Sequence, residues 1–243
     1  MEIIFGEAGD DGVFVDFDNN KSLLVTGAHS VGKSTLMHFI LSGLFAKAEK
    51  ENLGFTLIDA NRVEFGVYRN NRFVEKIITR RDDFIQFLES FVLGKQKYDK
   101  QHFIIIDDLD FFDLKEFDNN TADLLFGFIQ TANLSSNIRL IVGSSYIENS
   151  RIYNELTSYF VSKIFFVFQS LNDLKRLTGM NDTPTLQLYE YIGFLNKEIY
   201  YPVRFRNMDE KEIFKTTTRF SIAKFKEYME RRRLEIDGAP RNE

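Results

Sequence analysis

The segment Gly27 to Ser34, which reads GAHSVGKS, has the residue types and spacing of a phosphate-binding loop. It fits the pattern G-x-x-x-x-G-K-[ST], in which glycines let the backbone curl so that successive N–H groups face a phosphate. Lys33 supplies a positive charge for the β- and γ-phosphates, and the Ser34 hydroxyl is a ligand for Mg²⁺. The predicted nucleotide-binding residues are Gly27, Ala28, His29, Ser30, Val31, Gly32, Lys33, Ser34 and Thr35.

A second acidic group should complete such a site from a neighbouring strand. The apolar run 103–106 ends at Asp107, and a carboxylate there can face the crevice at the carboxyl end of the sheet. We expect Asp107 to hold Mg²⁺ through water, together with Ser34. Asp108 occupies the position of the carboxylate that polarises the attacking water, but it is one methylene shorter than glutamate. Asp108 is therefore either a working catalytic group beside Lys33, or a turn cap in a site that binds but scarcely hydrolyses.

Several other polar residues are weaker candidates. We expect the imidazole of His29 to face solvent or a neighbouring subunit rather than a metal, and His38 to be structural. Ser144 and Ser145 end the next apolar run, where a polar side chain could sense the γ-phosphate or simply close a strand.

The elements that must position these residues alternate along the chain. Short apolar runs predict buried strands, and apolar residues spaced three and four apart predict helices. The strands are expected at 13–16, 22–26, 55–58, 77–78, 103–106, 140–142 and 164–168, and the helices at 33–50, 82–93 and 121–132. This order predicts an α/β fold with a mainly parallel central sheet flanked by helices. The segments 189–195 and 198–203 are predicted to form a late antiparallel strand pair.

Composition excludes several classes of protein. The 243 residues contain no cysteine, which excludes disulfides, a thiol nucleophile and a cysteine zinc site. A net charge of −5 disfavours non-specific nucleic-acid binding. No apolar run approaches the roughly 20 residues of a membrane span, and the N-terminus lacks the pattern of a signal peptide. We therefore expect a soluble, cytoplasmic chain.

The chain changes character near its C-terminus. Residues 1–206 carry the α/β pattern, whereas residues 207–243 are charged and contain one amphipathic helix candidate, Ser221 to Leu234. We expect this tail either to pack back on the domain or to dock a partner.

Residues 5–206 resemble the FtsK/SpoIIIE branch of P-loop ATPases through several matched segments. A short hairpin at 10–18 precedes the loop strand. Residues 57–68 are similar to the segment "IDPK…E…Y", with Asp59, Glu64 and Tyr68 retained and Asn61 in place of lysine. Residues 138–145 are similar to the strand "IHLILATQ", with Ser145 in place of glutamine. Within this branch, the chain looks most like the C-terminal ATPase domain of a type VII secretion coupling protein, EssC or EccC.

The resemblance implies a RecA-like fold that binds ATP and Mg²⁺. It further implies contacts with neighbouring ATPase domains, small helical secreted proteins as substrates, and a membrane anchor in upstream parts of a parent protein. The departures at Asn61, Asp108 and Ser145 imply weak or partner-dependent hydrolysis. Two alternatives stay open: a DNA translocase like FtsK, and a non-hydrolysing module for assembly or substrate docking.

Overall fold

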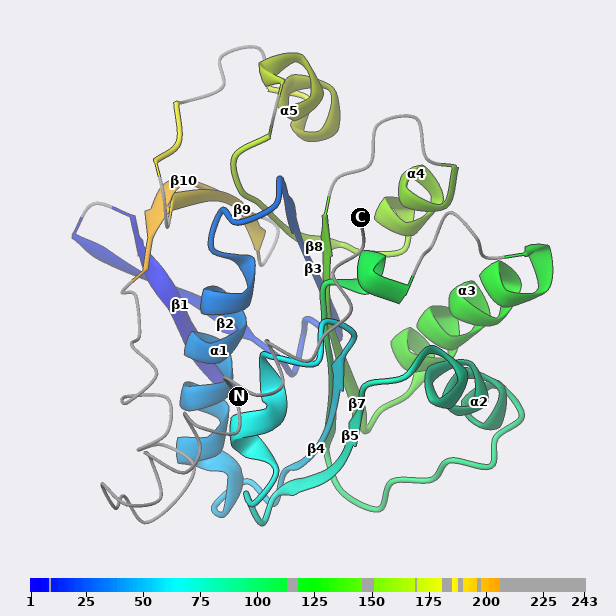
Figure 1. Ribbon diagram of the computed structural model, residues 1–243. Coiled ribbons are helices and arrows are strands. Elements are labelled where there is room, and N and C mark those ends of the chain that lie inside the picture. Colours follow the sequence, from blue (N-terminus) through cyan, green and yellow to red (C-terminus); the bar gives the residue numbers. More distant parts are fainter. Residues whose placement is uncertain are drawn as a thin grey trace.

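A computed structural model describes residues 1–8, 10–112, 118–145, 151–168, 170–180, 185–187, 190–195 and 198–205. Ten strands form one sheet in the order β2-β1-β10-β9-β8-β3-β7-β6-β4-β5 (Figure 1). The strands are β1 Glu2–Ala8, β2 Asp11–Asp16, β3 Ser22–Gly27, β4 Gly54–Asp59, β5 Val74–Ile78, β6 His102–Asp107, β7 Ile138–Ser145, β8 Ser162–Phe165, β9 Glu190–Leu195 and β10 Glu198–Arg204.

The sheet has a parallel half and an antiparallel half. All pairings within β8-β3-β7-β6-β4-β5 are parallel, whereas β2, β1, β10 and β9 extend the sheet in antiparallel fashion beyond β8. The parallel strands β3, β4, β6 and β7 are buried along their whole length. This explains why they appear in the sequence as continuous apolar runs rather than as alternating patterns.

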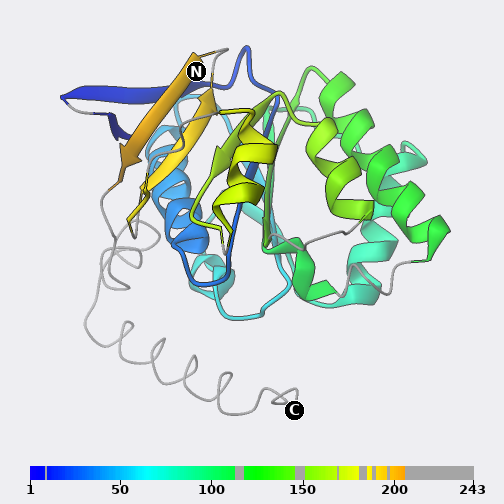
Figure 2. The same cartoon turned by 90° about the horizontal axis from the view of Figure 1, so that it is seen from above.

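Five α-helices and two 3₁₀ helices connect the described strands. They are α1 Lys33–Ala48, η1 Phe65–Tyr68, α2 Arg81–Val92, η2 Leu109–Phe112, α3 Asn119–Leu134, α4 Arg151–Ser158 and α5 Leu171–Thr178. Helix α1 covers one face of the sheet, and α2, α3 and α4 cover the other, so that the sheet is the middle of three layers (Figures 1 and 2).

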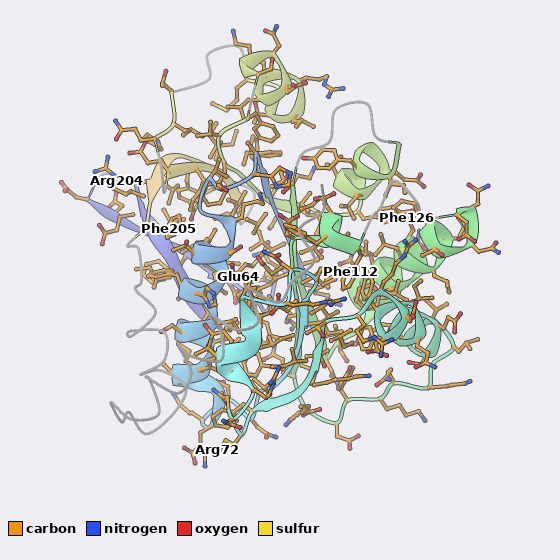
Figure 3. All side chains as sticks on the ribbon, in the orientation of Figure 1. Glu64, Arg72, Phe112, Phe126, Arg204 and Phe205 are labelled. Carbon is orange, nitrogen blue, oxygen red and sulfur yellow. The ribbon has the colours of Figure 1, made fainter. Side chains whose placement is uncertain are left out.

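Two large hydrophobic clusters lie on the two faces of the sheet. The cluster on the α1 side contains Leu36, Ile40 and Phe205, and the cluster on the side of α2 and α3 contains Phe112 and Phe126 (Figure 3). This double coverage confirms the predicted α/β fold class, with a mainly parallel sheet and helices on both faces. The antiparallel pair at 190–204 is confirmed as well.

The sequence patterns missed some elements. Strand β1 pairs with β2 and β10, and α4 and α5 are only eight residues long, which is too short for a clear helical period. The predicted helix at 221–234 and the whole tail 207–243 lie outside the described residues. Within the described part of the chain, no helix is long and apolar enough to cross a membrane.

Candidate functional site

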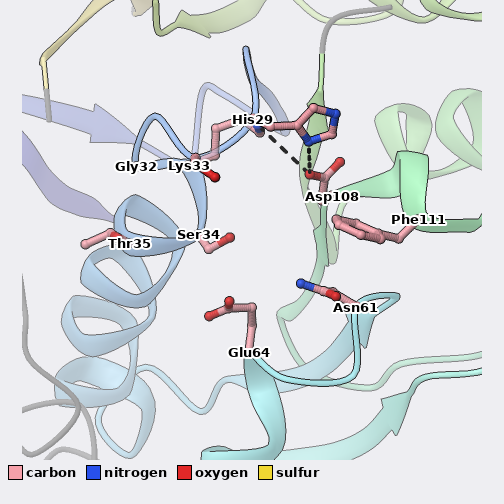
Figure 4. A pocket seen from close by; sticks show the side chains of 10 residues that line it. His29, Gly32, Lys33, Ser34, Thr35, Asn61, Glu64, Asp108 and Phe111 are labelled. Atoms are coloured by element: carbon pink, nitrogen blue, oxygen red, sulfur yellow. Dashed lines mark ion pairs between the residues drawn. The ribbon is translucent and has the colours of Figure 1, made fainter. Parts of the chain in front are cut away.

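The carboxyl ends of four parallel strands meet at one edge of the sheet and bring the predicted site residues together. Strand β7 lies between β3 and β6, and β4 follows β6. In the strand register Gly27 is level with Ser145, and Asp59 is level with Asp107. A pocket of about 290 Å³ opens above this edge. It is lined by His29, Ser30, Gly32, Lys33, Ser34, Thr35, Asn61, Glu64, Asp108 and Phe111 (Figure 4).

The loop between β3 and α1 is held by backbone geometry that favours glycine. Gly32 has a φ of 110° at the residue before α1 begins, a value that side-chain-bearing residues rarely adopt. A Cβ on Gly27 would lie 2.6 Å from the Cβ of Phe166. The N–H of Ala28 donates to the carbonyl of Val167 at 2.8 Å, which ties the loop to the chain beyond β8.

The side-chain ammonium group of Lys33 lies against the backbone of the loop between β3 and α1. Its Nζ donates to the carbonyl of Ala28 at 2.8 Å and to Ser145 Oγ at 3.1 Å. Burial lowers the pKa of Lys33, while the nearby Asp108, Asp107 and Asp110 carboxylates oppose that shift. The lysine is therefore a desolvated cation at the N-terminus of α1, where a polyphosphate would add a further favourable negative charge.

Ser34 and Asp107 form the predicted pair of oxygen donors. The Ser34 hydroxyl donates to Asp107 Oδ2 at 3.1 Å, and the other oxygen, Oδ1, is buried without a hydrogen-bond partner. Burial, and then the neighbouring carboxylates Glu64 and Asp59, raise the pKa of Asp107 well above its ordinary value. A cation would relieve both the unpaired oxygen and the crowded negative charge.

These donors fit Mg²⁺ chemically. Magnesium prefers oxygen ligands and usually takes only one or two from the protein, the rest coming from phosphates and water. Among the described residues, no group of three or more His, Cys, Asp or Glu side chains is arranged to hold a metal ion. Ser34 and Asp107 would hold the ion, which would draw charge from the phosphate oxygens.

Asp108 lines the pocket, and its carboxylate is hydrogen-bonded to Ser145 at the end of β7. Oδ2 accepts from Ser145 Oγ at 2.8 Å, and Oδ1 accepts from the Ser145 N–H at 3.2 Å. The residue has a φ of 44°, and its Oδ2 lies 4.0 Å from Lys33 Nζ. Both readings of Asp108 therefore have structural support: it faces the pocket, and it also links two strand ends.

Asp110 joins the same network. The Ser144 hydroxyl donates to Asp110 Oδ2 at 3.0 Å, and the N–H of Ser145 donates to the same oxygen. Burial and the adjacent Asp108 raise the pKa of Asp110 to about 7. Sequence reasoning missed Asp110, because a carboxylate three residues after the strand carries no pattern of its own.

The histidines differ in environment, as expected. The side chain of His29 is 65% exposed, with Nδ1 placed 3.1 Å from Ser145 Oγ. His38 is buried on α1 between Tyr68 and Glu64. The pocket also contains Asn61 and Glu64, which the sequence identified only as parts of the segment after β4. Their placement follows from β4 lying beside β6, which the sequence does not specify.

One family model matches somewhat less than half of the chain. The sequence model of the FtsK/SpoIIIE family matches residues 2–106. No curated protein matches the chain in sequence. EssC (ATPases 2 and 3) from Geobacillus thermodenitrificans has a TM-score of 0.69 at 14% identity, covering 99% of this chain and 50% of that one.

Two further solved structures are similar. The cytoplasmic domain of the type VII secretion ATPase EccC from Thermomonospora curvata has a TM-score of 0.69 at 17% identity, covering 90% of this chain and 30% of that one. The pCW3 conjugation coupling protein TcpA, solved with ATPγS, has a TM-score of 0.63 at 17% identity, covering 84% of this chain and 66% of that one. At these identities the likeness shows the fold. The chain spans half the length of the EssC structure and less of the EccC one.

Proposed function

We propose that this chain, whose residues 2–106 match the FtsK/SpoIIIE family model and whose fold is similar to that of EssC, is a P-loop ATPase domain that binds Mg-ATP. We propose further that it couples nucleotide state to the export of small helical proteins by a type VII secretion system. The observation that carries the proposal is the contact between Ser34 and Asp107 beside the buried Lys33. This arrangement places a hydroxyl and a desolvated cation at the pocket wall and, in contact with the hydroxyl, a buried carboxylate with one unpaired oxygen.

The binding step follows from the geometry of the loop. The N–H groups of residues 29–32 and the N-terminus of α1 would receive the phosphates, because backbone N–H groups that face the pocket and the helix dipole both favour an anion. Lys33 would exchange its bond to the Ala28 carbonyl for phosphate oxygens. Thr35, at the pocket wall, would contact the α-phosphate.

The export role rests on similarity. EccC of Thermomonospora curvata has been solved in complex with a signal sequence peptide, and the EssC structure holds adjacent ATPase domains. By analogy, we propose that this domain works beside neighbouring ATPase domains at the cytosolic face of a membrane, anchored through other parts of a parent protein. Hydrolysis would be weak or dependent on such a neighbour, and Lys33 and Asp108 are the catalytic candidates that the sequence pattern indicates.

A DNA-translocating role is the second candidate. TcpA, a conjugation coupling protein, has a similar fold. The net charge of −5 weighs against it, because phosphate-backbone binding depends on clustered lysine and arginine. A non-hydrolysing docking or assembly module is the third possibility, and it would retain nucleotide binding without turnover.

One experiment separates these roles. Fluorescence anisotropy of a labelled helical export-signal peptide and of a labelled DNA duplex would be measured against the chain, with and without Mg-ATP. We expect the peptide to bind with an affinity that depends on Mg-ATP, and the duplex not to bind at physiological salt. Salt-sensitive duplex binding without peptide binding would favour the translocase. Peptide binding that is indifferent to nucleotide would favour the docking module.

A further inference from the structure

The carboxylate of Glu64 enters the nucleotide pocket from a different wall than Asp108. Glu64 lies at the residue before η1 and lines the pocket with Ser34. In Figure 4 its side chain points across the pocket toward Ser34, from the side opposite Asp108. A glutamate reaches farther into the pocket than an aspartate by one methylene, which matters because a catalytic base must reach the proton that it removes.

The backbone beside Glu64 is held by a hydrogen bond to the Asp59 side chain. This aspartate ends β4 and is 1% exposed. Its Oδ2 accepts from the N–H of Phe65 at 2.9 Å. This bond holds the turn after β4 against the strand end, so a buried contact fixes the backbone of the residue next to Glu64.

The carboxylate of Glu64 is held by His38, which is in turn held by Tyr68; we call these two residues the relay. Glu64 Oε2 lies 3.1 Å from His38 Nε2, and His38 Nδ1 lies 2.6 Å from the Tyr68 hydroxyl. His38 and Tyr68 are buried. A neutral imidazole satisfies both contacts when Nε2–H donates to Glu64 and Nδ1 accepts from Tyr68. Such an arrangement fixes both the tautomer and the ring orientation, and thereby restricts the rotamers of Glu64.

Asp108 has a different set of partners. Both of its oxygens accept hydrogen bonds from Ser145, one from the hydroxyl and one from the backbone N–H. Moving Asp108 toward a substrate would break the link between the ends of β6 and β7. Glu64 Oε2 contacts His38 of α1, and reorienting this carboxylate would leave the hydrogen bonds between Asp108 and Ser145 in place.

We propose that Glu64 is the carboxylate that removes a proton from the attacking water, and that His38 and Tyr68 are the residues that position it. The inference rests on the proposed function, since it requires ATP in the pocket. The water oxygen forms a bond to the γ-phosphorus while the bond from phosphorus to the β–γ bridging oxygen breaks. The water proton passes to Glu64 and then to solvent, and the products are ADP and inorganic phosphate. No oxidant or reductant is needed.

The test is phosphate release under single-turnover conditions, with protein in excess over Mg-ATP. The variants are Glu64→Gln and Asp108→Asn, with Glu51→Gln as a matched control because Glu51 is exposed on a distant turn. We expect Glu64→Gln to slow release by about 100-fold or more, within the usual range for a general base. The rate of phosphate release should fall less in Asp108→Asn than in Glu64→Gln, and the rate of Glu51→Gln should equal that of the wild type.

Binding is measured on the same samples by calorimetric titration of Mg-ATP. We expect Glu64→Gln to retain an affinity within about threefold of the wild type, and unhydrolysed ATP to remain bound to it after incubation. Three results would overturn the assignment of Glu64. The first is a rate of phosphate release that falls by less than about tenfold in Glu64→Gln. The second is a larger fall in Asp108→Asn than in Glu64→Gln, and the third is a wild-type rate no faster than that of Lys33→Ala. If the wild type fails to bind Mg-ATP, the proposed function itself fails. If the wild type binds Mg-ATP but any of those three rate results is found, only the assignment of Glu64 fails and the proposed nucleotide binding stands.

The positioning role has its own readout. Tyr68→Phe removes the hydroxyl beside His38, and His38→Gln removes the contact of the ring with Glu64. Both variants should lower kcat by about tenfold and leave KM unchanged, because the misplaced carboxylate affects the chemical step and not binding. Thermal unfolding checks that the variants fold. An unchanged kcat in folded variants, or an equal change in kcat and KM, would contradict the relay.

Discussion

The Ser34 hydroxyl and Asp107 Oδ2 lie 3.1 Å apart, although 73 residues separate them in the chain. This contact joins the first turn of α1 to the end of β6. It exists because the strands are parallel, which places the residues that follow them at one edge of the sheet. The phosphate-binding loop and the acidic strand end thus form one site.

Asp107→Asn should reduce the dependence of ATP binding on magnesium. The variant keeps an oxygen near Ser34 but loses the charge that would hold the ion through water. Such contacts are typically worth about 10- to 100-fold in metal affinity. Calorimetric titrations with Mg-ATP, and with ATP in the presence of a chelator, would measure the difference.

The same variant should not be less stable than the wild type. Burial raises the pKa of Asp107, so its ionised form is unfavourable in the folded protein. Asp99→Asn, at an exposed position, is the matched control for both measurements. Equal magnesium dependence in Asp107→Asn and Asp99→Asn would contradict the assignment of Asp107.

The stability of the fold should fall between about pH 4 and pH 7. The pKa of Asp110 is about 7 in the folded protein, against an ordinary value of 3.8. Between these values the folded state keeps a proton that the unfolded state has lost, so rising pH favours unfolding, and this contribution levels off above pH 7. The buried Asp59 and Asp107 carboxylates, whose pKa values are also raised, act in the same direction.

Asp110→Asn should remove part of this pH dependence. The amide oxygen can still accept from Ser144, but the buried charge is gone. The free energy of unfolding of the variant should therefore exceed that of the wild type by an amount that grows between pH 4 and pH 8 and reaches up to about 4 kcal/mol. Urea unfolding of both proteins at pH 4 and at pH 8 measures the change. A pH dependence identical to that of the wild type would show that Asp110 titrates normally.

Gly27→Ala should destabilise the fold and weaken ATP binding together. The new Cβ would meet the Cβ of Phe166 at 2.6 Å and the Val167 carbonyl at 3.1 Å. Relief requires moving the chain after β8 away from the loop. We expect a loss of about 1–3 kcal/mol, typical of overpacking in a filled interior.

Gly127→Ala provides the matched control for Gly27→Ala. Gly127 lies inside α3, and a Cβ there would come no closer than 3.5 Å to the Val92 side chain. Alanine should be neutral or stabilise the helix by up to about 1 kcal/mol. Thermal unfolding of both variants, with ATP titration of each, would test the contrast. Equal effects at the two glycines would show that the loop tolerates a side chain.

Much of the fold was predictable from the sequence, because the buried parallel strands are unbroken apolar runs. Residues 103–106 and 140–142 predict β6 and β7, and both strands prove to be longer by one to three residues at their ends. The missed elements have weak local signals. Strand β1 alternates only briefly, and α4 and α5 have two turns each.

The site was predictable where a motif fixes both residue type and spacing. Gly27 to Thr35 and Asp107 needed no knowledge of strand order. Glu64, His38 and Tyr68 did, because their contact depends on the turn after β4 lying beside α1, which only the sheet order establishes. Likewise, nothing in the pattern of Asp108 indicates that Ser145, 37 residues away, holds both of its oxygens.

The central claim is that the pocket lined by Lys33 and Ser34, with Asp107 buried against Ser34, binds Mg-ATP, and calorimetric titration tests it most directly. The comparison is between the wild type, Lys33→Ala and the control Lys50→Ala, which changes an exposed lysine just after α1. We predict saturable binding to the wild type and to Lys50→Ala, with affinity lost by about 100-fold or more in Lys33→Ala. No heat of binding in the wild type, or equal affinity in Lys33→Ala, would contradict the account.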